Sequence, residues 1–261
     1  MSGLLLRLAG PMQSWGDHST FSVRDTATVP TRSAMIGMLA AAKGLHRGEP
    51  LGDLTTLRFT VRVDRPGTMM DDFHTVGGGL PPDRTVPTAE GKRRQPGAGT
   101  IVSRRFYLVD AVFIVAVTGP DTIVEHVHEA LTMPVWAPYL GRRSCPAEQP
   151  FLLSGPTRDP VAHLEHLPLN RRRPVGDADC VPVDFVTEEP DGDGAGSRLT
   201  LNDIPMDLVS EPVTGDRQSR SRRYLTRQVH VTTRALPAAL CAGTGIKYLD
   251  TLDEHLRGVR T

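Results

Sequence analysis

The chain has 261 residues, of which 39% are apolar, and its formal net charge at pH 7 is zero. This length allows one large domain or two small ones with a buried core. No segment approaches the ~20 apolar residues of a membrane-spanning helix, and the N-terminus lacks the apolar core and cleavage site of a signal peptide. We therefore expect no association with a membrane and a cytoplasmic location.

The three cysteines, Cys145, Cys180 and Cys241, are odd in number and far apart in the sequence. Their spacing fits neither a disulfide framework nor a metal site. The sequence has no HExxH, GxSxG or Walker motif. We therefore expect no metal and no cofactor.

The first part of the chain predicts strands and helices in turn. An apolar run predicts a strand over 3–9, and a helix follows over 31–44 with Thr31 as its N-cap. Strict alternation predicts a half-buried strand over 57–66. Residues 67–100 are rich in Gly and Pro without a period, which indicates an excursion from a sheet such as a hairpin.

A long strand is predicted over 104–119 and a second helix over 121–134. This order matches the first part of a ferredoxin-like, RRM-type arrangement, so we expect an α+β fold. The remainder reads as β-rich, with an exposed acidic loop at about 184–196. The segment 246–258 predicts a short amphipathic helix.

Arginine greatly outnumbers lysine, and the arginines gather in clusters. Basic residues cluster at 91–109, 142–143, 171–173 and 217–234. A guanidinium group binds phosphate as a planar fork and stacks on bases. A neutral protein with such clusters suits a polyanion held along one track, although a solvated arginine-rich surface is the simpler interpretation of any one cluster.

Three segments join polar or aromatic side chains to glycines or a helix start. The loop after the first strand contains Gln13, Ser14 and Trp15, and an exposed indole would stack on a base. The alternative is that Trp15 covers the edge of the core, which is the simpler interpretation of this loop taken alone. The helix start at 31–33 offers free N–H groups to an anion, and ordinary capping explains Thr31 equally well. The loop 138–146 combines an aromatic side chain, a glycine and two arginines, which fits a passing phosphate backbone as well as a plain surface loop.

An enzymatic interpretation depends mainly on His74, which lies beside Asp71 and Asp72 in the sequence. A histidine next to carboxylates is a conceivable general base for RNA cleavage. A histidine in a turn also needs no function.

Four separated motifs resemble one known family. In order they are LRLAGPMQSWG, PTRSAMIGMLAAAKG, FHTV and PYLGRRSCP, and they span residues 4 to 146. Their order and spacing are similar to those of the CasD subunit family of the type I-E CRISPR surveillance complex, Cascade, within the RAMP superfamily. The C-terminal half resembles the family only loosely, in the stretch SRRYLTRQVHV.

The resemblance implies a modified RRM-like domain over 1–150 with an inserted β-hairpin, the thumb, at about 67–103. Residues 151–261 would form a β-rich C-terminal portion. The implied role is structural and non-catalytic: to bind and cap the 5′ handle of CRISPR RNA (crRNA), which contributes to antiviral defence. Implied partners are a CasC-type backbone subunit and a CasA-type large subunit, with target DNA contacted only through the assembled complex.

The residues expected to contact this RNA come from all three segments and from the basic cluster of the excursion. They are Gln13, Ser14, Trp15, Arg24, Thr31, Arg32, Ser33, Lys92, Arg93, Arg104, Arg105, Tyr139, Gly141, Arg142 and Arg143.

Two other hypotheses stay open on the sequence alone. Relatives of this subunit in another subtype cleave RNA, so the chain is alternatively a metal-independent endoribonuclease that uses His74 or Tyr139. It is also conceivable as a protein–protein module whose arginines contact acidic partners.

Overall fold

The computed structural model describes residues 2–20, 22–46, 48–79, 81–85, 92–93, 99–176, 178–190, 196–205 and 224–260. The strands are β1 (Ser2–Ala9), β2 (Met12–Gln13), β3 (Ser19–Thr20), β4 (Val23–Arg24), β5 (Arg58–Arg65), β6 (Thr68–Val76), β7 (Ile101–Val109), β8 (Val112–Thr118), β9 (Thr157–Arg158), β10 (Cys180–Thr187), β11 (Ser197–Pro205) and β12 (Tyr224–Pro237). The helices are α1 (Arg32–Ala42), α2 (Asp121–Thr132), α3 (Pro160–His163) and α4 (Ile246–Arg260), with short 3-10 turns at Gly52–Thr56, Pro82–Arg84 and Ala238–Leu240.

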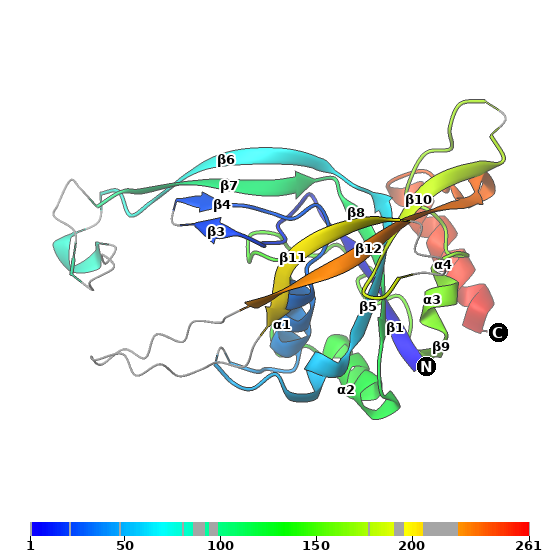
Figure 1. Ribbon diagram of the computed structural model, residues 1–261, viewed down its shortest axis with the longest axis horizontal. Coiled ribbons are helices and arrows are strands. Elements are labelled where there is room, and N and C mark those ends of the chain that lie inside the picture. The colour runs from blue at the N-terminus through cyan, green and yellow to red at the C-terminus, as the bar shows by residue number, and fades with distance from the viewer. Residues whose placement is uncertain are drawn as a thin grey trace.

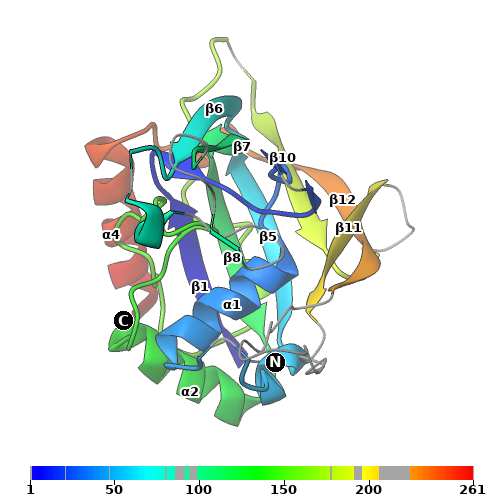
Figure 2. The same ribbon diagram turned by 90° about the vertical axis from the view of Figure 1, so that its left-hand side faces the viewer.

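A seven-stranded sheet forms the body of the protein, in the order β11-β12-β10-β5-β8-β1-β9, with each neighbouring pair antiparallel. Helices α1 and α2 pack on one face, and α3 and α4 pack on the other (Figures 1 and 2). The fold is therefore mixed α/β with mostly antiparallel pairing.

Strands β1 and β8 are apolar along almost their whole length because both of their faces are covered. In β1, Leu4 and Leu6 join the core beneath α1 and α2, whereas Leu5 joins the core beneath α4. Strand β8 divides in the same way, with Phe113 in the first core and Ile114 in the second.

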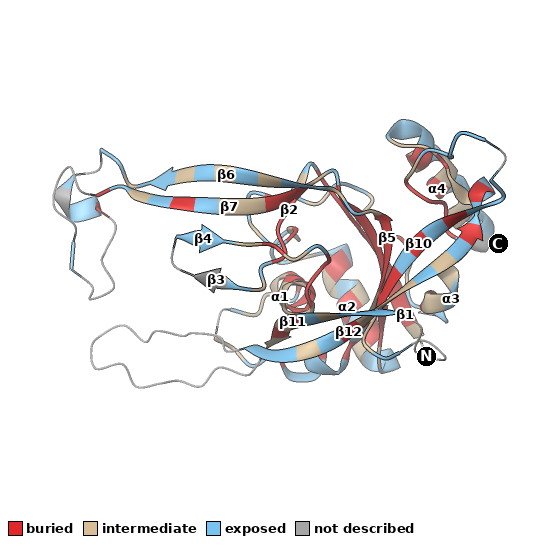
Figure 3. Cartoon of the chain, turned by 45° about the horizontal axis from the view of Figure 1, so that its top comes forward, coloured by how far each residue is buried: buried red, intermediate tan, exposed pale blue. Residues whose placement is uncertain are grey.

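A smaller sheet extends from the body. It has the order β2-β7-β4-β3. Strand β6 pairs with the edge of β7 that faces away from β2 and β4. The β6–β7 hairpin projects well beyond the helices (Figure 1), and most of its outer residues are exposed (Figure 3). The predicted excursion at 67–103 thus contains a paired hairpin.

The prediction of one long strand over 104–119 is wrong, because the chain bends at Asp110 and passes from one sheet to the other. Asp110 has a φ of 60°, which breaks the strand into β7 and β8. A matching bend separates β5 from β6 at Gly67, with a φ of +77°; a Cβ there would lie 2.8 Å from the Val109 carbonyl oxygen. Glycine meets both requirements.

The other predicted elements of the first half are confirmed as β1, α1, β5 and α2, and the terminal helix is confirmed as α4. The prediction that β5 is half-buried is wrong, because Arg62 and Asp64 on its polar side are buried as well. The C-terminal strands join the same large sheet, since β10 pairs with β5. The predicted acidic loop at 184–196 begins too early, because residues 184–187 belong to β10. Its part at 191–195 lies outside the described residues.

A buried ion pair attaches the C-terminal half to the sheet. The fully buried Arg62 side chain binds both carboxylate oxygens of Asp64, at 2.7 and 3.0 Å. It also donates to the carbonyl oxygens of Leu164, Leu167 and Pro168. Such a pair is tolerated inside a protein only when hydrogen bonds satisfy its remaining donors, as they do here.

No helix among the described residues is long and apolar enough to cross a membrane.

Candidate nucleic-acid interface

The loop 138–146 packs directly on the loop that follows β1. The Ser14 backbone N–H donates to the Leu140 carbonyl oxygen at 3.0 Å. Gly141 has a φ of +83°, and a Cβ on it would lie 1.6 Å from the Ser14 carbonyl oxygen. Only glycine allows the two backbones to approach this closely, so Gly141 permits the contact that the Ser14–Leu140 hydrogen bond makes between the two loops.

Gln13, Ser14 and Trp15 are buried structural residues. The Trp15 ring is 0% exposed, and its Nε1 donates to Gln13 Oε1 at 3.1 Å. Gln13 Nε2 donates in turn to the carbonyl oxygens of Leu8 and Ala111, and Ser14 Oγ donates to the Phe106 carbonyl oxygen. The prediction that Trp15 presents its ring to a base is wrong for this conformation, and the alternative that it packs on the core is confirmed.

Arg142 extends from the docked loop onto the smaller sheet. Its guanidinium lies over the Tyr107 ring, 4.6 Å from the ring centroid. Its Nη2 donates to the Arg24 carbonyl oxygen at 3.0 Å, while its Nη1 is buried and makes no hydrogen bond within the described structure. Arg142 therefore keeps its positive charge without a carboxylate partner. Arg143, next to it, is exposed.

Arg24 and Arg105 lie side by side on the same face of this sheet. The two residues are opposite each other in the parallel register of β4 and β7, and opposite residues of paired strands share a face. Tyr107, under Arg142, is two residues along from Arg105 and so faces the same way. We call Arg24, Arg105 and Arg142 the arginine face. Within the described part of the chain, none of the three forms an ion pair with a carboxylate.

Arg104 points to the other side of the hairpin, where it forms an ion pair with Asp71. It therefore does not belong to the arginine face, although it is adjacent to Arg105 in the sequence. Strand alternation, which separates successive side chains, explains the difference.

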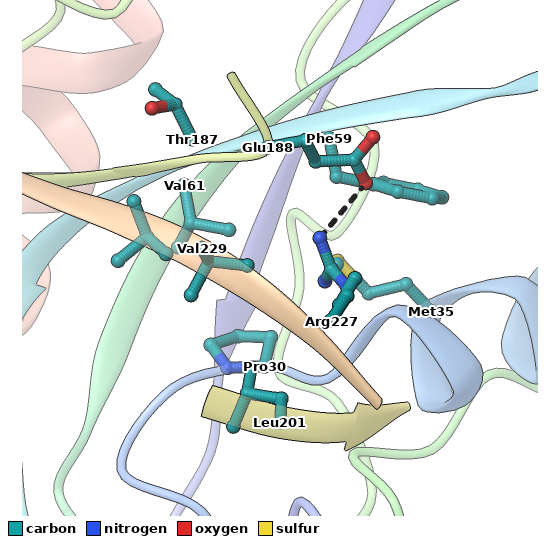
Figure 4. A pocket seen from close by; sticks show the side chains of 10 residues that line it. Pro30, Met35, Phe59, Val61, Thr187, Glu188, Leu201, Arg227 and Val229 are labelled. Atoms are coloured by element: carbon teal, nitrogen blue, oxygen red, sulfur yellow. Dashed lines mark ion pairs between the residues drawn. The ribbon is translucent and has the colours of Figure 1, made fainter. Parts of the chain in front are cut away.

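The start of α1 is already occupied by a carboxylate of this chain. The Arg32 backbone N–H donates to Oδ2 of the fully buried Asp203 at 2.6 Å. Arg227 binds the same carboxylate through Nε at 2.6 Å, and Glu188 accepts from Arg32 Nη1 at 2.6 Å. Figure 4 shows the contact of Arg227 with Glu188. We call Arg32, Glu188, Asp203 and Arg227 the helix-end network.

The prediction of a free anion-binding site at 31–33 is therefore wrong for this structure, because Asp203 already occupies it. Thr31 is the N-cap as predicted, but its side chain makes no capping hydrogen bond and is completely buried. The Arg32 side chain is only 11% exposed. Ser33 lies half-buried on the same turn.

The remaining predicted residues lie apart from the arginine face. Lys92 and Arg93 follow the paired part of the hairpin, beyond its last register pair at Val76 and Ile101. Lys92 is exposed, and Arg93 donates to the Thr85 carbonyl oxygen at 2.5 Å. Arg94, Arg217, Arg220, Arg222 and Arg223 lie outside the described residues.

His74 and Tyr139, the two candidates of the enzymatic hypothesis, make no contact with each other among the described interactions. His74 lies on β6 on the side of the arginine face, with its Nδ1 3.5 Å from Asp72 Oδ2, and both side chains are 40% exposed. Tyr139 is half-buried and pairs with Pro146 across its own loop. Beside Arg142, burial raises the pKa of the Cys145 thiol, which favours its protonated form.

No group of three or more His, Cys, Asp or Glu side chains that could hold a metal ion is found among the described residues.

Comparison with known proteins identifies the family. Residues 3–234 match the family described as CRISPR-associated protein (Cas_Cas5). This chain belongs to the Cas5 family. The chain is 36% identical over 231 residues to the CRISPR system Cascade subunit CasD of Escherichia coli (strain K12), covering 85% of this chain and 94% of that protein. The family resemblance predicted from the four motifs is thus confirmed.

Two solved structures are also similar to this Cas5 chain. One, described as a CRISPR RNA-guided surveillance complex, matches with a TM-score of 0.84 and 48% identity over 98% of this chain and 99% of that one. The other, described as a crystal structure of a Cas protein, has a TM-score of 0.57 and 30% identity over 93% and 98%.

The sequence analysis missed two residues that contact the predicted site: one supports an arginine of the arginine face, and the other occupies the start of α1. Tyr107 supports Arg142, and the alternation of the segment RFYLV places it on the face of Arg105. Asp203 closes the start of α1 from 171 positions away in the chain, and no local signal predicts that contact.

Proposed function

We propose that this Cas5-family chain is a non-catalytic structural subunit of a type I-E CRISPR surveillance complex, where it binds and caps the 5′ handle of crRNA. The named relative is a Cascade subunit, and one similar structure is a surveillance complex. Both support a role in such an assembly.

The observation that carries the RNA-binding part is the arginine face. Arg24, Arg105 and Arg142 converge on one side of the smaller sheet, and no carboxylate within the described residues pairs with them. Guanidinium groups bind phosphate oxygens through pairs of parallel N–H donors. A single-stranded handle can splay its bases while its phosphates follow these groups.

The topology supports the finer fold assignment within this proposal. Strands β9, β1, β8 and β5 are neighbours in that order, α1 follows β1, and α2 follows β8. This is the order of a ferredoxin-like, RRM-type unit with a very short last strand. The β6–β7 hairpin would then be the thumb of an RRM-like domain over 1–150, and 151–261 its β-rich C-terminal portion.

The same proposal names the neighbours. A CasC-type backbone subunit and a CasA-type large subunit would contact this chain in the cytoplasm, and target DNA would be reached only through the assembled complex. A competition experiment would separate this role from that of a protein–protein module. If the arginine face binds RNA, added RNA should displace an acidic protein from it.

One observation favours the alternative of a metal-independent endoribonuclease. His74 and Asp72 lie on the side of the hairpin that carries Arg105, so a phosphate bound there would be near an imidazole. The 3.5 Å separation exceeds a normal hydrogen-bond distance, and one histidine supplies only one of the acid and base groups that cleavage needs.

The test uses the full chain incubated with repeat RNA and with its excised 5′ handle, in the presence of EDTA. The proposal predicts that both RNAs are bound and recovered intact, with the His74→Ala variant identical to the wild type. Cleavage that is lost in His74→Ala would establish the endoribonuclease instead. A chain that binds neither RNA, alone or with its neighbouring subunits, contradicts the RNA-binding role.

A further inference from the structure

The β3–β4 hairpin carries Arg24 of the arginine face, but few backbone pairs attach it to its sheet. Strand β4 pairs with β7 over two residues, and β3 pairs with β4 over two. The carbonyl oxygens of Arg24 and Asp25 also accept the hydrogen bonds of the Arg142 guanidinium, at 3.0 and 3.4 Å. The position of this hairpin therefore determines where two of the three arginines present their charge.

A residue of the C-terminal half contacts the chain just before this hairpin. Asn202 lies on β11, and its backbone N–H donates to Asp17 Oδ1 at 2.6 Å. Its side-chain Nδ2 contacts Nε2 of His18. Figures 1 and 3 both show the β3–β4 hairpin between the β6–β7 hairpin and β11. We call Asp17, His18, Asp25 and Asn202 the Asn202 cluster.

The hydrogen-bond partners determine which atoms of the cluster donate. Thr226 Oγ1 donates to Asn202 Oδ1, so the amide Nδ2 of Asn202 donates to His18 Nε2. An imidazole with one N–H has one donor and one acceptor nitrogen. The hydrogen therefore lies on His18 Nδ1, which is 2.9 Å from Asp17 Oδ2. Both ring nitrogens of His18 are thus held, one by β11 and the other by its own loop.

The two carboxylates of the cluster accept from N–H groups and not from the arginines. Asp25 accepts the backbone N–H groups of Asp17 and His18, at 3.4 and 2.8 Å. Asp17 accepts from Asn202 and from His18. Asp25 is next to Arg24 in the sequence, yet no ion pair joins them within the described residues. The cluster therefore keeps these carboxylates from neutralising the arginine face.

We propose that Asn202 is a positioning residue for RNA binding: through Asp17 and His18 it holds the β3–β4 hairpin so that Arg24 and Arg142 bind the same RNA strand. Asn202 itself does not contact the RNA. This inference rests on the proposed function, because the property that it affects is RNA binding by the arginine face. It assigns a part in that binding to the C-terminal half of the chain.

The test measures the affinity of the full-length Asn202→Ala variant for handle RNA over a range of salt concentrations. We expect the affinity to fall at least about fivefold at low salt, because charge-assisted contacts to phosphate are lost. The slope of log affinity against log salt should fall by about 0.7 to 1.4, the value for one or two phosphates on a single strand. The urea midpoint should shift by less than about 0.5 M, as for one lost hydrogen bond.

Thr200→Ala is the matched control, since Thr200 is an exposed residue two positions along the same strand. It should bind RNA with the affinity and the slope of the wild type. Unchanged affinity in Asn202→Ala would overturn the inference. A lower affinity with an unchanged slope would also overturn it, because Asn202 would then contact the RNA without acting through the arginines.

Combining substitutions tests whether Asn202 acts through the arginines. In an Arg24→Ala/Arg142→Ala background, the additional Asn202→Ala substitution should change handle affinity by less than about twofold. Residues that act through one another give effects that do not add, whereas independent residues give additive effects. A full additional loss in this background would refute the positioning role.

His18 keeps the inference testable if Asn202→Ala does not fold. His18→Ala should weaken handle binding as Asn202→Ala does, whereas His18→Gln offers an acceptor to the Asn202 amide and should restore most of the affinity. Equal losses in the two His18 variants would contradict the inference. If the wild-type chain binds no RNA, the proposed function fails and this inference fails with it. If the wild type and Asn202→Ala bind equally, only the inference fails.

Discussion

The arginine face and the helix-end network are both built from arginines, but only those of the helix-end network are paired with carboxylates. Arg32 and Arg227 are nearly buried and bind Asp203 and Glu188 of the same chain. On the arginine face, Arg142 contacts the Tyr107 ring and a backbone carbonyl, and Arg105 donates to the Ser103 hydroxyl. None of its three arginines forms an ion pair with a carboxylate within the described residues. The first group binds the carboxylates of its own chain, and the second keeps its charge without such a partner, as the proposed RNA-binding role requires.

The difference shows that an arginine cluster in a sequence is not itself a binding site. What matters is whether the fold brings a carboxylate to it. Asp203 reaches the start of α1 from β11, whereas Asp72, opposite Arg105 in the hairpin, forms its contact with His74.

The largest effect should come from breaking the helix-end network. Asp203→Asn leaves Arg227 without its buried counter-charge, so the free energy of unfolding should fall by about 3 kcal/mol, as for a broken buried pair. Urea denaturation measures this change. The matched control is Glu189→Gln, which breaks the exposed pair with Arg58 and should cost less than about 1 kcal/mol. Equal losses would contradict a structural role specific to Asp203.

Gly141→Ala should have the next largest effect. Its Cβ would overlap the Ser14 carbonyl oxygen, and alanine is strained at a φ of +83°. The free energy of unfolding should fall by at least about 2 kcal/mol, since strain of this kind alone costs roughly 1–2 kcal/mol. Gly16→Ala is the control, because nothing lies within 4 Å of a Cβ there. If the two variants unfold alike, the two loops are not held together as described.

Removing the charge from the docked loop should weaken RNA binding while the fold survives. The double variant Arg142→Ala/Arg143→Ala should retain about tenfold less crRNA in the assembled complex, as expected for lost charge-assisted contacts. Quantifying RNA per purified complex measures this. Arg172→Ala/Arg173→Ala alters a second pair of adjacent loop arginines and should retain RNA normally. Full retention by the Arg142/Arg143 variant would remove Arg142 from the RNA path.

The smallest expected effect is an increase in the affinity for handle RNA. Asp72→Asn removes the carboxylate opposite Arg105, so handle RNA should bind about twofold more tightly at low salt, with the difference fading as salt screens the charge. Asp250→Asn on α4 is the control for a change in net charge. A lower affinity for the Asp72 variant would indicate that RNA does not pass this side of the hairpin.

Much of the fold follows from local pattern. Alternation predicted β5, and the apolar run of β1 and the cap at Thr31 predicted the first strand and helix. The bend at Asp110 was missed because the residues on both sides are equally strand-forming, and the break depends on the meeting of two sheets. At the candidate site, Arg105 and Arg142 could be predicted from composition. The burial of Trp15 and the closure by Asp203 depend on contacts that no local segment encodes.

The salt dependence of handle binding tests the central claim most directly. The triple variant Arg24→Ala/Arg105→Ala/Arg142→Ala is compared with Arg58→Ala/Arg198→Ala/Arg257→Ala, which removes the same charge outside the arginine face. Each lost phosphate contact lowers the slope of log affinity against log salt by about 0.7 for a single strand, so the first variant should lose a slope of about 2. The control should keep the wild-type slope. An unchanged slope in the first variant would contradict an RNA-binding arginine face.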